Sequence, residues 1–552
     1  MADNAAAPSR LFHSPLNKWD AWLILIALAA TGIVLGKDIS VGGLRYGDTA
    51  VHAMDGVLIH DWIAAGPSAW VEPMAFAEAQ YGHYPCLGIG RHYPPGFAVV
   101  EAAFFGVFGV SPFTARLAVV FFGLLACIGA YLFLRTLTDR STSLLGSVIL
   151  MTLPAVTRWG RQTMLEVPTL AALTWCAFAF SWYIVSPSRR RFAVLVLTAT
   201  ATIAFRQTGV FLLGAIAMAL FFAARRRRVP WAHFWIGAAI AVAVIIGVAL
   251  SFEGAAARMF RGRASHESLW GVDALTFYLR RLPDLTGWSM LAASAVGMVV
   301  CMRNHKAQGV FLVAWLVVSY VMLCAADLKY ARFFFVGLFP FAVWAALAIG
   351  SVLRRIRGSK LHPIAVGIVC LTLCVDAFGQ RIQYYPDYGT VVAAHRDKIE
   401  KHAVLFGGVR DNHFVFAVRQ HLPWRSTVAV RSSKLLYVCN TYPTIDFESL
   451  VDSPQALSDT MRRYAFRCVI TERGNRLYIP QEALLQDYLQ NGEDYHHVAM
   501  HEMRADERRS ARNTMVDVYE IAEPRTRVVD HIDIPIPRSN RTIRINLNAG
   551  AG

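Results

Sequence analysis

The sequence has few charged residues for its length. Only 17% of its 552 residues are Asp, Glu, Lys or Arg, while 55% are hydrophobic. A soluble chain of this length would divide into several domains with polar surfaces. Here apolar blocks recur through the first 380 residues. Many are long enough to cross the hydrocarbon core of a bilayer, which takes about 20 helical residues. The composition therefore indicates a polytopic membrane protein.

Two common signals are also missing. The segment Leu11–Thr31 has no clean small-residue cleavage site and further apolar segments follow it, so it is interpreted as the first span and not as a signal peptide. The nine cysteines show no spacing typical of a metal site. Cys439 and Cys468 lie in the polar tail, where they could form a disulfide if the tail is periplasmic. Six others lie in apolar runs and are expected to pack there: Cys127, Cys176, Cys301, Cys324, Cys370 and Cys374.

Acidic residues are fewer than basic ones, and the placement of the basic residues is informative. The net charge is +16, but the arginines cluster in short connectors between apolar runs. Such connectors are typical of cytoplasmic loops, so we expect no nucleic-acid partner. Asp139 is the acidic exception among them. The connectors hold Arg135/Arg140, Arg189–Arg191, Arg225–Arg228, Arg303/Lys306 and Arg354–Lys360.

The fold class predicted from this pattern is a polytopic α-helical membrane protein with about eleven transmembrane helices and a small C-terminal α/β soluble domain. Residues 1–19 are predicted to be cytoplasmic, 20–380 to form the membrane module, and 381–552 to be periplasmic, in a bacterial inner membrane. The predicted spans are 20–36, 113–134, 142–157, 167–185, 192–205, 209–223, 231–251, 286–302, 308–326, 332–353 and 361–379.

The count depends on the apolar segment Gly96–Gly109. It is only 14 residues long, contains Glu101 and lies between prolines. A segment this short is more typical of an interfacial or re-entrant helix than of a span. We place it in a first periplasmic loop, 37–112, that carries juxtamembrane helices. If it crossed the membrane, the later arginine-rich connectors would fall on the wrong side.

The tail beyond residue 380 has more charged residues and shorter apolar runs. This pattern indicates a small α/β domain. The stretch from about Pro535 is polar and is expected to fray. Strands are predicted at Val404–Gly407, Thr427–Val430, Cys468–Thr471 and Met515–Ile521, and helices at Val391–His402 and Gln455–Tyr464.

Asp48 lies just beyond the first span, in the first outer loop. If a helix follows, Asp48, His52 and Asp55 share one face, because they are spaced four and three residues apart. A carboxylate at the membrane surface is suited to act as a general base. The same residue would also serve as the N-cap of a juxtamembrane helix. The sequence leaves both interpretations open.

The run Arg91–Gly96 contains Arg91, His92 and Tyr93 before two prolines that fix the entry into the next helix. It is either a turn or a set of donors for a phosphate at the headgroup level.

Arg161 and Glu166 lie in a second outer connector, and Glu166 starts an apolar span. Glu166 either stabilises the helix N-terminus or belongs to a functional site, because ionisable groups at this depth are costly.

Further cations flank the outer ends of other spans. Arg206 lies between two apolar runs of about 14 residues each. It either snorkels to the surface or faces a polar cavity, and the short flanking spans favour the cavity. Lys329 and Arg332 follow at another outer boundary, as interfacial anchors or as an anion site.

Together these motifs resemble the GT-C membrane glycosyltransferases over about residues 20–380. The nearest relatives would be the protein O-mannosyltransferases, the aminoarabinose transferases of lipid A and the Rgt-type lipopolysaccharide glycosyltransferases. The resemblance lies in the order of Asp48, Tyr93-Pro94-Pro95, Arg116, Arg161 to Pro168, Arg206-Gln207-Thr208 and Lys329-Tyr330-Ala331-Arg332.

The resemblance implies transfer of a sugar from a polyprenyl-phosphate donor to an envelope glycolipid or protein on the periplasmic face of the bilayer. Asp48 would be the catalytic base and Glu166 the second acidic position; both would be the ligands if a divalent metal is bound. Arg161, Arg206, Lys329 and Arg332 would contact the donor phosphate. The family's Lys-Pro-Pro-Leu is Tyr93-Pro94-Pro95-Gly96 here, so its lysine is missing, and Arg91 or His92 would take its place.

This chemistry fits the layout, because an anionic lipid-phosphate leaving group needs cations more than it needs an acid. The alternative is a transporter or flippase of lipid-linked glycans. A transporter usually shows inverted repeats and ionisable groups within its spans. This sequence shows no repeat, and its ionisable residues lie at span ends on one side. A membrane scaffold would leave the position of Arg206 unexplained.

Overall fold

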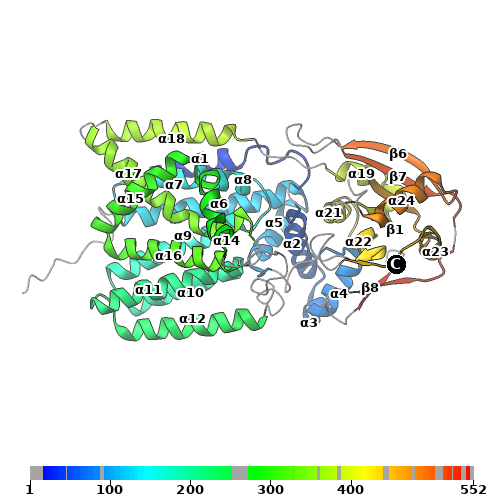
Figure 1. Ribbon diagram of the computed structural model, residues 1–552, viewed down its shortest axis with the longest axis horizontal. Helices are drawn as coiled ribbons and strands as arrows, with labels where there is room; N and C mark the ends of the chain where they lie inside the picture. The colour runs from blue at the N-terminus through cyan, green and yellow to red at the C-terminus, as the bar shows by residue number, and fades with distance from the viewer. Residues whose placement is uncertain are drawn as a thin grey trace, which may run out of the picture. The chain divides into compact units, whose positions relative to one another are not determined.

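In the computed structural model, the contacts between residues divide the chain into two compact units. Figure 1 labels many of the helices and strands of these units. Unit 1 comprises residues 1–39, 89–97 and 116–382, and unit 2 comprises 40–88, 98–115 and 383–552. The first loop therefore groups with the C-terminal tail. The residues described are 16–44, 47–86, 93–251, 271–326, 329–356, 361–381, 387–408, 410–438, 447–473, 479–503, 514–524, 526–535 and 542–547.

Unit 1 is helical in its described residues, and each of the eleven predicted spans overlaps a helix. α6 begins in unit 2. The helices are α1 (Lys18–Leu35), α6 (Pro112–Arg135), α7 (Arg140–Thr152), α8 (Pro154–Gly160), α9 (Glu166–Val185), α10 (Arg189–Phe205), η1 (Gln207–Gly209), α11 (Val210–Arg225), α12 (Trp231–Ser251), α14 (Val272–Thr286), α15 (Trp288–Asn304), α16 (Lys306–Cys324), η2 (Ala331–Gly337), α17 (Leu338–Ile356) and α18 (His362–Gly379).

Seven of the helices in the described residues are long and apolar enough to cross a membrane, or eight if α14 and α15 form one bent span. The chain is therefore a multi-pass membrane protein, and the number of eleven crossings stays a prediction. α5 (Gly96–Phe108) is one of the shorter apolar helices, with 13 residues. Its placement at the interface also stays a prediction.

The structure has two helix breaks within or beside the predicted spans. The segment 142–157 is split between α7 and α8 at Leu153, because Pro154 cannot continue the preceding helix. The segment 286–302 is preceded by α14, which meets α15 at an angle of 109°. Gly287 makes this bend possible, since its φ of 81° is strained for residues with a side chain.

Close packing between α15 and α17 depends on small side chains. A Cβ at Gly297 would lie 1.7 Å from the carbonyl oxygen of Trp344, so only glycine permits this approach. Ser294 Oγ donates a hydrogen bond to the Phe341 carbonyl over 2.8 Å. Small residues and interhelical hydrogen bonds are the usual means of helix association in membranes.

The acids near the arginine-rich connectors are buried or paired. Asp20 accepts hydrogen bonds from Arg135 Nε at 2.6 Å, Arg140 Nε at 3.1 Å and Tyr131 at 2.7 Å. Asp139 caps α7 by accepting from the Thr142 amide over 3.0 Å, and it pairs with Arg354. The acidic exception in the connectors therefore has a structural role.

Unit 2 combines helices of the first loop with a mixed sheet from the tail; α5 enters it from unit 1. Its helices are α2 (Thr49–Ala64), α3 (Pro67–Val71), α4 (Pro73–His83), α5, α19 (Gly389–Ala394), α20 (Arg396–Ile399), α21 (Asp411–His421), α22 (Ser432–Leu435), α23 (Pro454–Tyr464) and α24 (Pro480–Asn491). Its strands are β1 (Ala403–Gly407), β2 (Val428–Arg431), β3 (Tyr437–Val438), β4 (Glu448–Ser449), β5 (Cys468–Arg473), β6 (Tyr495–Met503), β7 (Thr514–Ile521), β8 (His531–Pro535) and β9 (Thr542–Asn546).

The main sheet of unit 2 has the strand order β2-β1-β5-β7-β6. β2, β1 and β5 run parallel, while β7 and β6 add antiparallel strands at one side. β1, β2 and β5 are buried along almost their whole length, as expected for parallel strands covered on both faces. The predicted α/β domain is thereby confirmed.

One buried ion pair joins the first loop to the tail within unit 2. Asp61 of α2 accepts from Arg419 Nε at 3.0 Å and from Arg419 Nη2 at 2.5 Å. Gln80 of α4 donates to Asp61 over 2.7 Å. Burial alone would raise the pKa of Asp61, but the hydrogen bonds from His60 and Arg419 outweigh it and hold the pKa below its usual value.

Parts of the tail differ from the predictions. The end of the chain is not frayed throughout, because β9 pairs with β8 and Ile545 is fully buried. β6 was not predicted from the sequence. Cys468 is a buried free thiol whose pKa burial raises to about 12, and Cys439 lies outside the described residues.

Candidate functional site

An ion pair between Glu166 and Arg206 lies buried in unit 1. Arg206 Nη1 is 2.9 Å from Glu166 Oε1, and the two side chains are 7% and 1% exposed. Glu166 is the first residue of α9. Arg206 ends α10 with an extended backbone, φ −160° and ψ 138°, before η1 begins. The break between α10 and α11 therefore directs this arginine inward, as the short flanking spans predicted.

Arg332 approaches the same place. Its guanidinium lies 5.6 Å from the centre of the Phe333 ring, and the guanidinium of Arg206 lies 5.4 Å from that ring. Two cations on one aromatic ring repel each other, and each is attracted by the ring. With Glu166 carrying one negative charge, the three ionisable groups leave a net positive charge at this site.

Oε2 of Glu166 and the hydroxyl of Tyr278 are both buried, and neither has a hydrogen-bond partner among the described residues. Tyr278 lies on α14, stacks on Phe334 at 5.7 Å and interacts electrostatically with Arg206. Buried polar groups usually have partners, so such atoms beside a cation are suited to meet a ligand.

Tyr278 was missed by the sequence reasoning, because it belongs to none of the motifs and lies between the predicted spans 231–251 and 286–302, where a connector was expected.

The proline element is close to this cluster within unit 1. A Cβ at Gly96 would lie 2.4 Å from the Ala204 carbonyl oxygen, so the start of α5 touches the end of α10 two residues before Arg206. Tyr93 and the two prolines directly precede Gly96, so the chain's path brings them near Arg206. Arg91 and His92 lie outside the described residues.

Two predicted phosphate contacts have other partners. Arg161 donates to the carbonyls of Val34, Gln380 and Ala377 over 2.7, 3.0 and 2.8 Å. These bonds join the connector to α1 and α18. Lys329 Nζ donates to the Cys324 and Ala326 carbonyls, at 3.0 and 2.6 Å, and so caps α16. Both cations have structural roles in this arrangement.

Asp48 belongs to unit 2. It is the N-cap residue of α2, but its side chain makes no capping hydrogen bond. Its neighbours on the helix face, His52 and Asp55, are buried. The capping interpretation therefore lacks the bond it needs, and the general-base interpretation stays a prediction.

A metal ion is poorly matched to the surroundings of Glu166. Arg206 holds one of its carboxylate oxygens, and a guanidinium at 2.9 Å repels a second cation. Throughout the described part of the chain, no group of three or more His, Cys, Asp or Glu side chains could hold a metal. Asp48 and Glu166 belong to different units. Metal binding by these two acids stays a prediction.

Comparisons with known proteins agree with the predicted resemblance. The family model described as "Dolichyl-phosphate-mannose-protein mannosyltransferase" matches residues 92–250. This range contains Glu166 and Arg206 and ends before Tyr278. None of the curated proteins searched matches the chain.

Solved structures share the fold. ArnT from Cupriavidus metallidurans, bound to undecaprenyl phosphate, is 12% identical with a TM-score of 0.57, and the match covers 91% of this chain and 98% of ArnT. The Archaeoglobus fulgidus oligosaccharyltransferase in the apo form is 11% identical with a TM-score of 0.50, covering 83% of this chain and 70% of that one.

A third similar structure is AglB from Archaeoglobus fulgidus in complex with an inhibitory peptide and a dolichol-phosphate. It is 9% identical with a TM-score of 0.50, and the match covers 82% of this chain and 69% of AglB. At these identities the likeness shows the fold. The predicted resemblance to GT-C membrane glycosyltransferases is confirmed, and the matches indicate a glycosyltransferase.

Proposed function

We propose that this protein transfers a sugar from a polyprenyl-phosphate donor to a glycolipid or protein acceptor on the periplasmic face of a bacterial inner membrane. The observation that carries this proposal is the buried pair of Glu166 and Arg206, with the guanidinium groups of Arg206 and Arg332 both near the Phe333 ring. The similarity to ArnT, solved with undecaprenyl phosphate, supports the choice of donor class.

The cluster is suited to an anionic leaving group. The bond that breaks joins the sugar's anomeric carbon to a phosphate oxygen, and the lipid phosphate leaves with the electron pair. Guanidinium groups can hold phosphate oxygens through paired N–H bonds. Arg206 and Arg332 would stabilise the negative charge that develops, Glu166 would orient Arg206, and the Tyr278 hydroxyl would donate a further hydrogen bond.

Asp48 would act on the acceptor. A carboxylate that takes the proton of an acceptor hydroxyl makes the oxygen a better nucleophile as the new glycosidic bond forms. One carboxylate is enough for a direct displacement with inversion.

The role of Asp48 as the general base is tested by comparing a deletion strain with strains that carry variants of the gene. Mass spectrometry of envelope glycolipids and glycoproteins identifies the glycosylated product that a deletion strain loses. Complementation with Asp48→Asn should leave the product absent at normal protein levels, a loss of at least about a hundredfold for removal of a general base. Asp38→Asn is the matched control, because Asp38 has a positive φ of 57° that asparagine tolerates. Normal product with Asp48→Asn would refute the base assignment.

The test of the phosphate site is direct binding of undecaprenyl phosphate to purified protein. Arg206→Ala and Glu166→Gln should both weaken binding, while Arg158→Ala should not, since Arg158 is an exposed arginine of α8. Equal affinities in all variants would remove Arg206 and Glu166 from the site. A flippase reconstituted in vesicles would move the lipid-linked glycan across the vesicle membrane without forming a glycosylated product. That result would favour the flippase over the glycosyltransferase.

A further inference from the structure

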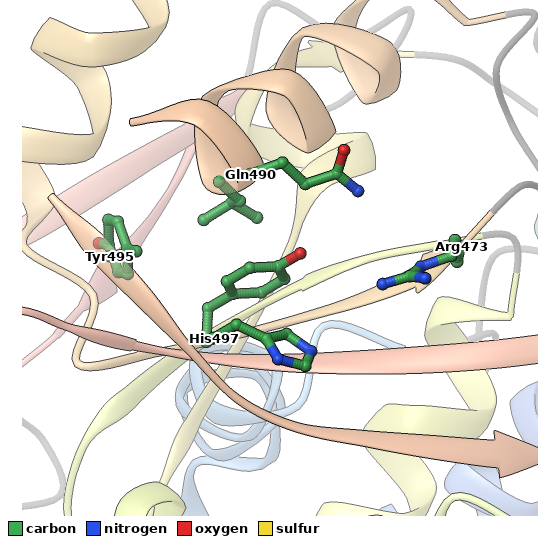
Figure 2. Close-up of a pocket in the computed structure, with 6 residues that line it drawn as sticks. Arg473, Gln490, Tyr495 and His497 are labelled. Atoms are coloured by element: carbon green, nitrogen blue, oxygen red, sulfur yellow. The ribbon is translucent and has the colours of Figure 1, made fainter. Parts of the chain in front are cut away.

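A polar hollow lies within unit 2, on the sheet of the tail. It has a volume of about 460 Å³ and is lined by Arg473, Leu489, Gln490, Tyr495, His497 and Tyr519. This size lies within the usual range for sites that bind small molecules. Figure 2 shows the polar ends of Arg473, Gln490 and His497 around one space.

The register of the sheet explains why these residues meet. Tyr495 and His497 lie two residues apart on β6, and His497 is directly opposite Tyr519 on β7. Arg473 ends β5, which pairs with the other edge of β7. Alternate residues of a strand point to the same face, so all of them project toward one side. Leu489 and Gln490 come from the end of α24, which covers part of that face.

A buried carboxylate holds the rim in place. Asp517, which is 1% exposed, accepts from Arg473 Nε and Nη2 at 2.8 and 2.9 Å and from His497 Nε2 at 3.0 Å. Arg473 and His497 are themselves nearly half exposed. Two rim side chains thus have fixed orientations, although their outer edges reach solvent. Such preorganisation reduces the entropy lost on binding.

The floor of the hollow is formed by tyrosine side chains, and the net charge of the lining is close to zero. Tyr519 is 3% exposed, and burial is the main cause that raises its pKa, so its hydroxyl stays protonated. Gln490 and Arg473 line the hollow together with Tyr519. The charge of Arg473 is balanced by Asp517. Planar polar groups on the rim above tyrosine rings provide donors, acceptors and apolar surface together.

We propose that this hollow is a binding site for a neutral saccharide of one or two rings. Sugar hydroxyls both donate and accept hydrogen bonds, which guanidinium, amide and imidazole groups at the rim can match. An anionic ligand is disfavoured because the Asp517 carboxylate lies directly behind Arg473 and cancels its charge. The site is separate from the transfer chemistry and does not depend on the proposed function.

The experiment measures ligand binding to the full chain in detergent by saturation-transfer NMR. Maltose and chitobiose are the neutral probes, and inorganic phosphate and glucuronic acid are the anionic probes. At least one neutral disaccharide should bind the unaltered protein with a Kd of roughly a millimolar. Gln490→Ala and His497→Ala should each weaken that binding about tenfold, since each removes about one hydrogen bond.

His496→Ala is the matched control, because His496 is the exposed neighbour of His497 on β6 and projects to the other face. It should leave binding unchanged, and thermal melting should be alike in the three variants. The proposal is overturned if no neutral saccharide binds, if all three variants bind alike, or if only phosphate and glucuronic acid bind. Saccharide bound in the membrane unit would be insensitive to these substitutions and would give the second of these results.

Discussion

At the scale of single residues, Glu166 and Arg206 show how a buried ion pair depends on both partners. They are separated by 40 positions in sequence and meet only because α9 begins where α10 ends. Moving charges away from water is costly, and a pair recovers this cost only when both charges remain. The position of Arg206 between two short apolar runs was visible in the sequence. Its partner was not, because contact across 40 residues is set by tertiary packing.

Removing one member of this pair should cost more than removing both. Arg206→Met leaves Glu166 as an unpaired buried carboxylate and should reduce stability by about 3 kcal/mol or more. The double substitution Glu166→Gln with Arg206→Met should recover most of that loss. Thermal unfolding of the purified variants in one detergent measures this, and an additive effect of the two substitutions would contradict a coupled pair.

Asp61 should make stability depend on acid pH. Its folded pKa lies below its ordinary value of 3.8, so the folded state binds this proton less readily than the unfolded chain. The stabilisation is present above about pH 4 and disappears as the pH falls through the folded pKa. Asp61→Asn should lower stability by about 3 kcal/mol at pH 7.

The loss from Asp61→Asn should become smaller as the pH falls below the ordinary carboxyl pKa of 3.8 and through the lower pKa of the folded state. Urea unfolding at a series of pH values measures both effects. Asp533→Asn is the control, because its pair with Arg544 is exposed to solvent and should contribute little to stability. A loss for Asp61→Asn that is the same at pH 3 and pH 7 would show that the carboxylate charge is not the cause.

At the scale of elements, the apolar pattern located a helix for each of the eleven predicted spans and the four tail segments predicted as strands, but it missed α14. The apolar pattern also failed to predict strands that contain or adjoin many polar residues. β6 reads Tyr-His-His-Val-Ala-Met-His-Glu-Met, and an edge strand of this composition has no clean alternation. β9 is short and lies among polar residues, yet its pairing with β8 buries Ile545. Pairing partners far away in sequence decide such strands, and local composition does not.

The junction of α5 with α10 should be sensitive to one methyl group. Gly96→Ala would place its Cβ 2.4 Å from the Ala204 carbonyl, so the two helix ends must separate by several tenths of an ångström or more. We expect a loss of about 1–3 kcal/mol in stability and weaker binding of undecaprenyl phosphate, since Arg206 follows Ala204 closely.

Gly367→Ala on α18 serves as the control for the Gly96 substitution, because nothing lies within 4 Å of the added Cβ. Alanine should there be neutral or slightly stabilising. Thermal unfolding and lipid binding of both variants give the comparison. If Gly96→Ala matched the control in both measurements, the close contact with α10 would not be important for stability or for lipid binding.

At the scale of the whole molecule, the membrane topology decides which residues share a side. The prediction of an external tail follows from the arginine-rich connectors. A reporter enzyme that is active only outside the cytoplasm should be active when fused after Gln380 and inactive when fused after Arg227. The second fusion is the control, as it lies in the most basic connector. Activity after Arg227 and none after Gln380 would reverse the assignment of every loop.

The assembly of unit 2 from the first loop and the tail has a consequence for biosynthesis. Residues 40–88 and 98–115 leave the ribosome long before residue 383, where the rest of the unit begins. Apolar residues of the first loop, such as Met54 and Val57, share one core with Phe406 and Phe414 of the tail. At usual rates of protein synthesis the loop waits on the order of tens of seconds for this partner. During that time its apolar side chains need the lipid surface or chaperones to shield them from water. In a chain truncated before the tail, these side chains would never be covered by their partner residues.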